Sequence, residues 1–149
     1  MFAVAGQRTF FVVFILDSVK YGLDINNIQE IIQKPEIQPL PAPDGCLIGT
    51  INLHGNIIPV LDIKRKQPSP ATPLYNDTRV IIVEDADQRT GLIVDEVLEV
   101  ISVPNEKLIE GATAENPDYS EYTWGTARLE PHTLIVFDAR LILESARKP

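Results

Sequence analysis

The segment Gly22 to Ile32, GLDINNIQEII, returns later in the chain as Gly91 to Ile101, GLIVDEVLEVI. Glycine, leucine, glutamate and isoleucine are identical, and isoleucine is matched by valine at three other places. A second pair follows in the same order, because Gly49 to Ile63 (GTINLHGNIIPVLDI) aligns without gaps with Gly125 to Ala139 (GTARLEPHTLIVFDA). Two ordered matches predict two copies of one small β-rich unit, related by a pseudo-two-fold, with seven extra residues in the second copy around Glu110 to Asn116.

The composition limits both the domain organisation and the partners. A chain of 149 residues with 44% hydrophobic content forms one domain or two small ones. A half of about 65 residues buries only about 60% of its unfolded surface, so we expect the halves to share apolar surface. The net charge of −8 disfavours nucleic acid and anionic membranes as partners, since both attract basic proteins. The lone Cys46 excludes an internal disulfide and favours a reducing compartment.

The strand signals come in pairs. The run Thr9 to Leu16 is β-branched and aromatic, and with Tyr21 to Ile25 it predicts a hairpin. Cys46 to Leu53 and Asn56 to Ile63 predict another hairpin, joined at His54 and Gly55. Several short strands with turns between them favour two small antiparallel barrels packed side by side. Met1 to Arg8 carries no basic cluster before an apolar core, so neither a signal peptide nor membrane insertion is expected.

Helical signals are few. Ile25, Ile28, Ile31 and Ile32 have helical spacing before Pro35, which predicts a short helix or helical turn. The matching second-copy segment is rich in β-branched residues, and a strand is equally consistent with it. Asp138 is a candidate N-cap for a closing helix over 139–145. These signals predict a first subdomain at about 9–66, a linker at about 67–77 and a second subdomain at about 78–143.

The run Asn52 to Ile63, NLHGNIIPVLDI, resembles the signature of the CheW family of bacterial chemotaxis coupling proteins. That signature is close to Asn-Leu-Arg-Gly, three residues, then Pro-Val, a hydrophobic residue, Asp and Leu. Three further segments agree in the same order, so the resemblance covers Thr9 to Leu143: YGLDINNIQEI from Tyr21, GLIVDEVLEVISVP from Gly91 and GTARLEPHTLIVFDARLIL from Gly125. The resemblance implies two five-stranded SH3-like barrels with a shared hydrophobic core.

The resemblance also implies a function. It indicates a non-enzymatic cytoplasmic adaptor, without cofactors, that couples transmembrane chemoreceptors to a CheA-type histidine kinase in arrays at the inner face of the membrane. One barrel face would hold the regulatory domain of the kinase, and the groove between the barrels would hold the receptor's cytoplasmic tip. His54 stands where the family has arginine, and in similar proteins that arginine pairs with the glutamate aligned with Glu30. This departure, and the basic stretch that begins at Lys64, fit a variant chemosensory system such as one for surface motility.

Nine residues are candidate partner contacts. We expect Ile28 to point outward and Ile31 inward. Glycines in this set more often allow a positive φ or a close strand approach than a partner contact, and for the valines a core position is the even alternative. The nine are Ile25, Ile28, Glu30, Ile32, Gly49, His54, Gly91, Val97 and Val100.

Chemical sites have weaker support. His54 and His132, with Asp62 or Asp138, lack the spacing of a metal site. The two aspartates are repeat equivalents on separate halves, where capping explains them better than acid–base catalysis. The rival function is a small-ligand or oligonucleotide-binding barrel. Acidity counts against it, and the aromatic residues are interpreted as strand core: Phe10, Phe11, Phe14, Tyr21 and Trp124.

Overall fold

The structure is a computed structural model that describes residues 6–33, 35–64, 74–111 and 119–147. One group of strands comprises β1 Arg8–Leu16, β2 Val19–Asp24, β9 Glu96–Pro104, β10 Leu108–Glu110, β11 Thr123–Arg128 and β12 Thr133–Phe137. A second group comprises β3 Ile28–Ile32, β4 Gln38–Asp44, β5 Leu47–Leu53, β6 Asn56–Leu61, β7 Arg79–Asp85 and β8 Gln88–Val94. The helical elements are the 3-10 turns η1 Ile25–Asn27, η2 Asn105–Lys107 and η3 Ser120–Tyr122, and the helix α1 Ala139–Arg147.

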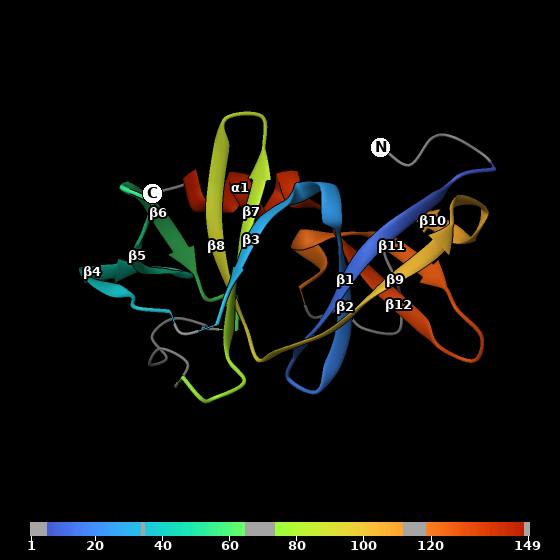
Figure 1. Cartoon of the computed structure of the whole chain (residues 1–149), viewed down its shortest axis with the longest axis horizontal. Helices are drawn as coiled ribbons and strands as arrows, with labels where there is room; N and C mark the ends of the chain where they lie inside the picture. The colour runs from blue at the N-terminus through green and yellow to red at the C-terminus, as the bar shows by residue number, and fades with distance from the viewer. Residues whose placement is uncertain (1–5, 34, 65–73, 112–118, 148–149) are drawn as a thin grey trace.

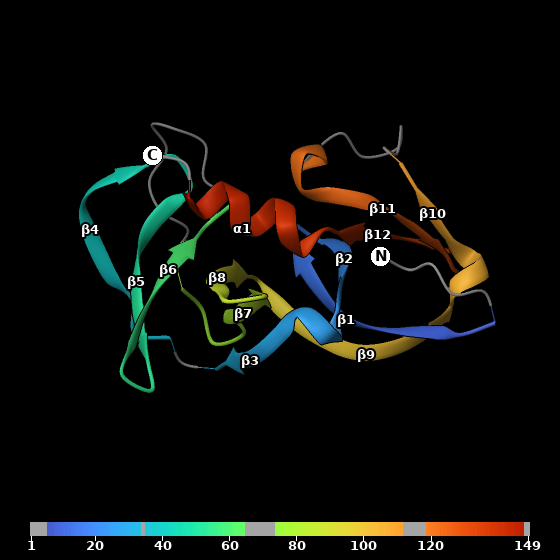
Figure 2. The same cartoon turned by 90° about the horizontal axis from the view of Figure 1, so that it is seen from above.

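The two groups form two curled sheets that lie side by side (Figures 1 and 2). In barrel one the strand order is β10-β11-β12-β2-β1-β9, and in barrel two it is β3-β7-β8-β6-β5-β4. The mostly β, two-barrel architecture is confirmed. Each sheet has six strands where five were expected, because the segment predicted as helical forms β3 in barrel two and the chain resumes as β10 after η2 in barrel one.

The two sequence halves are interlaced. Barrel one takes the β1–β2 hairpin from the first half and β9 to β12 from the second, whereas barrel two takes β3 to β6 from the first and β7–β8 from the second. The predicted subdomain boundaries, 9–66 and 78–143, are therefore wrong, because each copy gives its N-terminal hairpin to the barrel of the other. Local sequence cannot reveal such an exchange, since a hairpin presents the same edge to either copy. Of the expected linker at 67–77, residues 67–73 lie outside the described residues.

Two equivalent parallel strand pairs join each exchanged hairpin to the strands of the other half. Val60 of β6 lies opposite Gly91 of β8, and Val136 of β12 lies opposite Gly22 of β2. These four residues are the equivalents predicted by the sequence repeat. The repeat therefore describes a true pseudo-two-fold of the fold.

The pseudo-two-fold passes close to Cys46 and Tyr122, which are repeat equivalents. The Asp62 amide donates to the Cys46 carbonyl at 2.8 Å, and the Asp138 amide donates to the Tyr122 carbonyl at the same distance. The Tyr122 hydroxyl lies 4.0 Å from the Cys46 sulfur. Equivalent residues that contact one another must lie next to the axis.

Three apolar cores hold the molecule together. Barrel one is filled around Phe11, Val13 and Leu134, and barrel two around Ile51, Ile58 and Ile82. The third and largest core lies at the junction, where both barrels and α1 meet. Its aromatic centre is Phe137, whose ring lies 4.7 Å from that of Tyr21 and 5.6 Å from that of Phe14. The halves share apolar surface, as their size predicts.

The predicted short helix or helical turn over Ile25 to Ile32 is present only as a turn at its start. Only Ile25–Asn27 forms a turn, with the Asp24 carboxylate accepting from the Asn26 amide at 2.9 Å. The isoleucines that follow form β3, which pairs with β7 so that Ile31 lies opposite Ile81. Strand pairing with the hairpin of the other half overrides the local helical spacing, and β-branched residues favour that outcome.

Other local predictions are confirmed. The turn between β5 and β6 places His54 and Gly55 at positive φ values of 52° and 88°, as a tight two-residue hairpin turn requires. The closing helix is present as α1, and the Asp138 carboxylate accepts from the Arg140 amide at 2.9 Å. Figure 2 shows α1 beginning beside β12 at the junction and running across barrel two, where it contacts β7 and β8.

Candidate functional site

An exposed apolar strip runs along the outer face of β1 and β9 in barrel one. Phe10 is 51% exposed and Val100 is 53% exposed, while Ile25 and Leu98 are nearly 40% exposed. Val100 lies opposite Val12, which shares a face with Phe10, so Phe10 and Val100 are diagonal neighbours. Ile25 follows Asp24, which pairs with Phe11. We call the group Phe10, Ile25, Leu98 and Val100 the outer strip.

A strand irregularity shapes the outer strip. The register between β1 and β9 shifts after Val13, so that Glu99 lies opposite Val13 but Val97 lies opposite Phe14. Leu98 is left without an opposite residue, as the extra residue of a β-bulge is. Val97 packs against the junction core. Four large apolar side chains are thereby presented to solvent beside the junction, a feature typical of protein docking surfaces.

Two of the nine predicted contacts, Ile25 and Val100, belong to the outer strip. Phe10 and Leu98 were missed. Phe10 was predicted to be core because its strand is apolar on both faces, so the sequence shows no alternation from which to read its orientation. The other predicted core aromatics are confirmed: Phe11, Phe14 and Tyr21 are buried, and Trp124 packs against the barrel-one core.

The predicted isoleucine contacts are less exposed than expected. Ile28 packs with Ile31 against the junction core, so its outward orientation is corrected to a half-buried one. Ile32 is also half-buried and packs against the core of barrel two. Both side chains have mainly packing roles, because β3 pairs along its length with β7.

The two predicted glycines are buried packing residues, and the expectation that they touch a partner is corrected. A Cβ on Gly49 would clash with the main-chain oxygen of Gln38, and a Cβ on Gly91 would lie 2.8 Å from a Val80 methyl. Their repeat equivalents, Gly125 and Gly22, meet backbone and side chain in the same way. All four allow strands to approach closely.

Glu30 and His54 meet at the end of barrel two. The His54 Nε2 atom lies 3.2 Å from Glu30 Oε1, which is the contact that the family resemblance implies. The side chains are 73% and 41% exposed, so the pair contributes at most about 1 kcal/mol to stability. It borders a hollow of about 390 Å³ that Ile32, Ile51 and Leu53 also line.

A polar network fastens the two barrels at their junction. The Lys64 ammonium lies 2.7 Å from Asp95 Oδ1 and 3.5 Å from Asp17 Oδ1. The Tyr119 hydroxyl donates to the other Asp17 oxygen at 2.7 Å, and the Asp17 amide donates to Asp95 at 2.9 Å. Burial lowers the pKa of Lys64, but the hydrogen bonds and charges of Asp95 and Asp17 outweigh it and raise the pKa above its usual value. Lys64 therefore stays charged and links the end of β6 to the β1–β2 turn of barrel one and to the connection between β8 and β9.

No metal-binding cluster is assembled in the part of the chain that the structure describes, because these residues contain no group of three or more histidine, cysteine or acidic side chains that could hold a metal ion. Asp62 and Asp138 are both buried and lie at the ends of β6 and β12, in different barrels. Among the helices that the structure describes, none is long and apolar enough to cross a membrane.

Comparisons with known proteins agree with this geometry. The model of the CheW-like domain matches residues 11–147. The chemotaxis protein CheW of Treponema pallidum is 29% identical over 147 residues, which cover 96% of this chain and 86% of that protein. CheW of Bacillus subtilis is 25% identical over 133 residues, covering 89% and 85%. The crystal structure of the scaffolding protein TtCheW from Thermoanaerobacter tengcongensis is similar with a TM-score of 0.77 and 32% identity, covering 89% of this chain and 90% of that one.

Proposed function

This chain belongs to the CheW-like domain family, and from that premise we propose that it is a non-enzymatic adaptor coupling chemoreceptors to a CheA-type histidine kinase. Its partners are the regulatory domain of the kinase and the cytoplasmic tip of the receptor. Recruitment by the receptor brings it to arrays at the inner face of the membrane. The observation that supports this function most directly is the match to a CheW-like domain over residues 11–147, and the exposed apolar strip adds a surface suited to docking.

We assign the kinase contact to the outer strip. Val100 and Phe10 are each about half exposed, and they lie on paired strands that present one rigid surface. A cluster of aromatic and aliphatic anchors at that density is what a stable interface needs at its centre. All four residues of the strip are apolar, so desolvation of their side chains on docking costs little.

Predicted contact residues outside the strip have other roles in this proposal. Val97 lies beneath the strip and fixes the position of β9 through the junction core. Glu30 and His54 lie on barrel two, in β3 and in the turn between β5 and β6, and are available to a second partner. We assign the receptor tip to barrel two and the groove between the barrels, so that the two partners bind simultaneously, as an adaptor requires.

The test is calorimetric titration of this chain with the regulatory domain of a CheA-type kinase from the same genome. We expect a dissociation constant of about 1 µM for a small interface with few anchors. Val100→Asp places a charge in the strip and should abolish the heat of binding, because the carboxylate would be desolvated without a partner. The fold should be retained, since the side chain is 53% exposed.

The matched control is Ile57→Asp. Ile57 is 66% exposed at the start of β6 in barrel two, away from the strip. Binding should be unchanged in this variant. If both substitutions weaken binding equally, the assignment of the strip is wrong. If no kinase regulatory domain binds the unmodified chain, the coupling function itself is contradicted.

A further inference from the structure

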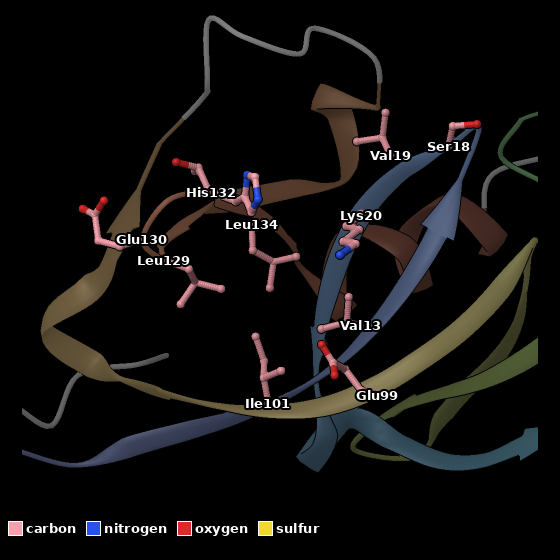
Figure 3. A pocket seen from close by; sticks show the side chains of 11 residues that line it. Val13, Ser18, Val19, Lys20, Glu99, Ile101, Leu129, Glu130, His132 and Leu134 are labelled. Carbon is pink, nitrogen blue, oxygen red and sulfur yellow. The ribbon is translucent and has the colours of Figure 1, made fainter.

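A second hollow, of about 560 Å³, opens at the end of barrel one (Figure 3). Its floor is aliphatic and consists of Val13, Ile101, Leu129 and Leu134. Lys20 and Glu99 stand at its rim, and Figure 3 shows both beside Val13 with their charged ends toward the hollow. The hollow faces inward from β1 and β9, whereas the outer strip lies on the opposite face of the same strands, because Glu99 and Ile101 alternate with Val100.

By the sequence repeat, this hollow is equivalent to the one that Glu30 and His54 border in barrel two. Glu99 and Ile101 are the repeat equivalents of Glu30 and Ile32. In barrel two the carboxylate is held by His54, but the position equivalent to His54 is Glu130 in barrel one. A carboxylate cannot pair with Glu99, and no ion pair joins Glu99 to any residue that the structure describes.

The cation at the rim also has a partner in barrel two but not in barrel one. Lys20 is the repeat equivalent of Arg89. The Arg89 guanidinium donates to the Gln29 side-chain oxygen at 3.4 Å, whereas Lys20 makes no such contact within the described part of the chain. Barrel one therefore presents a donor and an acceptor, both exposed and uncommitted, at the rim of an apolar hollow. In barrel two the equivalent groups, Glu30 and Arg89, already contact His54 and Gln29.

One chemical group complements this rim. Lys20 offers N–H donors and Glu99 offers acceptor oxygens. A peptide bond has one acceptor, its C=O, and one donor, its N–H, and it lies next to a side chain. An aliphatic residue of an extended segment can thus place its side chain on the floor while its backbone meets Lys20 and Glu99. A hydrocarbon alone leaves both charged groups without a partner, and a small ion complements only one of them.

We propose that the hollow of barrel one binds an extended segment of a partner protein, holding one aliphatic side chain on its floor and the adjoining backbone amides between Lys20 and Glu99. This site is additional to the adaptor contacts proposed above and does not depend on the identity of those partners. The floor differs between the barrels, because Val13 stands where barrel two has Ile82, which is larger by one methylene. The smaller residue leaves room that the other barrel fills with its own core.

The test is an NMR titration of the ¹⁵N-labelled full chain with N-acetyl-leucine N-methylamide, which carries one aliphatic side chain between two peptide bonds. We expect saturable shifts of amides around Val13, Glu99 and Leu134, with a dissociation constant on the order of 1 mM. The alanine analogue lacks most of the aliphatic anchor and should bind roughly tenfold more weakly. Equal binding of the two probes, or no saturable shifts at these amides, would overturn the proposal.

Substitutions distinguish the contribution of the rim to binding from that of the floor. Lys20→Met keeps the side-chain length but removes the donor, and it should weaken binding roughly fivefold, as should Glu99→Gln, which makes the acceptor neutral. Val13→Ile introduces the residue of barrel two and should weaken binding roughly threefold. The matched control Lys107→Met removes an exposed cation of η2 in the same barrel and should leave the affinity unchanged. Lys20→Met and Lys107→Met acting alike would also contradict the proposal. Lys20 and Lys107 are both exposed, so the comparison of these two variants tests the proposal even if Val13→Ile perturbs folding.

Discussion

The two barrels have the same architecture and differ at their ends and at the junction. Both are closed by a parallel strand pair with glycine on one side, and both use a second glycine where strand backbones meet. At the end of barrel two the Glu30 carboxylate pairs with His54, whereas at the end of barrel one Lys20 and Glu99 form no ion pair with a described residue. The residues that close each barrel thus stayed equivalent in the two copies, while the residues that face solvent diverged toward different contacts.

Interlacing explains why the closing residues are so similar. Since each barrel contains a hairpin from the other half, neither half contains a complete barrel. The junction core, with Phe14, Leu92 and Phe137 among its fully buried members, is shared by both halves and α1. The comparison therefore predicts that the barrels unfold together, and the substitutions below test it from the largest expected effect to the smallest.

Phe137→Ala should have the largest effect on stability. Phe137 is 1% exposed and contacts aromatic rings of both β1 and β2, so its removal leaves a cavity in the junction core. We expect a loss of about 3–5 kcal/mol in the free energy of unfolding. Urea unfolding followed by Trp124 fluorescence and by circular dichroism should give one coincident transition. The exposed control Ile57→Ala should change stability by less than about 0.5 kcal/mol. Two separated transitions in the unmodified chain would refute joint unfolding of the barrels.

The equivalent glycines provide the next comparison. Gly49→Ala and Gly125→Ala each place a Cβ against main-chain atoms of the neighbouring segment, so each should cost about 2–3 kcal/mol. Gly22→Ala and Gly91→Ala meet movable side chains of Leu134 and Val80 and should cost about 1–2 kcal/mol. Urea unfolding of all four variants measures these differences. A cost for Gly49→Ala that clearly differs from that of Gly125→Ala would show that the pseudo-symmetry does not extend to the energetics.

Lys64 and Arg140 are repeat equivalents whose surroundings differ. The Lys64 side chain is 17% exposed between two carboxylates, whereas that of Arg140 is 67% exposed and lies 3.8 Å from Asp138. Lys64→Met leaves Asp17 and Asp95 without their cation and should cost about 1–2 kcal/mol. Arg140→Met should cost less than about 0.5 kcal/mol. Thermal unfolding of both variants tests this order, and equal costs would mean that the network does not fasten the junction.

Tyr122 gives the smallest effect at neutral pH, because its contribution changes only at alkaline pH. Burial raises the pKa of the Tyr122 hydroxyl to about 12, despite a hydrogen bond with Ser145. The unfolded tyrosine loses its proton near pH 10. The folded chain therefore binds more protons between these values, and stability falls as the pH rises from about 10 to about 12. Tyr122→Phe should make this decline shallower in urea titrations at several pH values, with no change in slope at pH 7. An identical alkaline slope in both proteins would contradict the burial of this hydroxyl.

Local sequence was a good guide wherever the decisive contacts were local. The β5–β6 hairpin was readable because His54 and Gly55 separate two apolar runs, and Asp138 was readable as the cap of α1. The contact between His54 and Glu30 followed from the family resemblance and is present. The helical prediction failed beyond Asn27 because pairing with β7, about fifty residues further along the chain, determines the conformation of Ile28 to Ile32.

The candidate contacts were only partly predictable for a related reason. Val100 and Ile25 are exposed, but Gly49 and Gly91 are buried and Ile28 is half-buried. Phe10 lies in a strand that is apolar on both faces, and which face meets solvent depends on the barrel it joins. Solvent exposure is set by neighbours distant in sequence, so it could not be read from the strand itself.

The sequence by itself determined the repeat, the strand-rich class, the positions of the turns and the family, because these depend on residue order and on short-range backbone preferences. Only the tertiary structure decided which hairpin completes which barrel, which face of β1 and β9 is open to a partner, and that the end of one barrel is satisfied while the other is not. The physical reason is that two similar copies offer almost the same strand edges to each other. The choice between them is made by packing in the shared core at the junction, whose contacts join residues far apart in the chain.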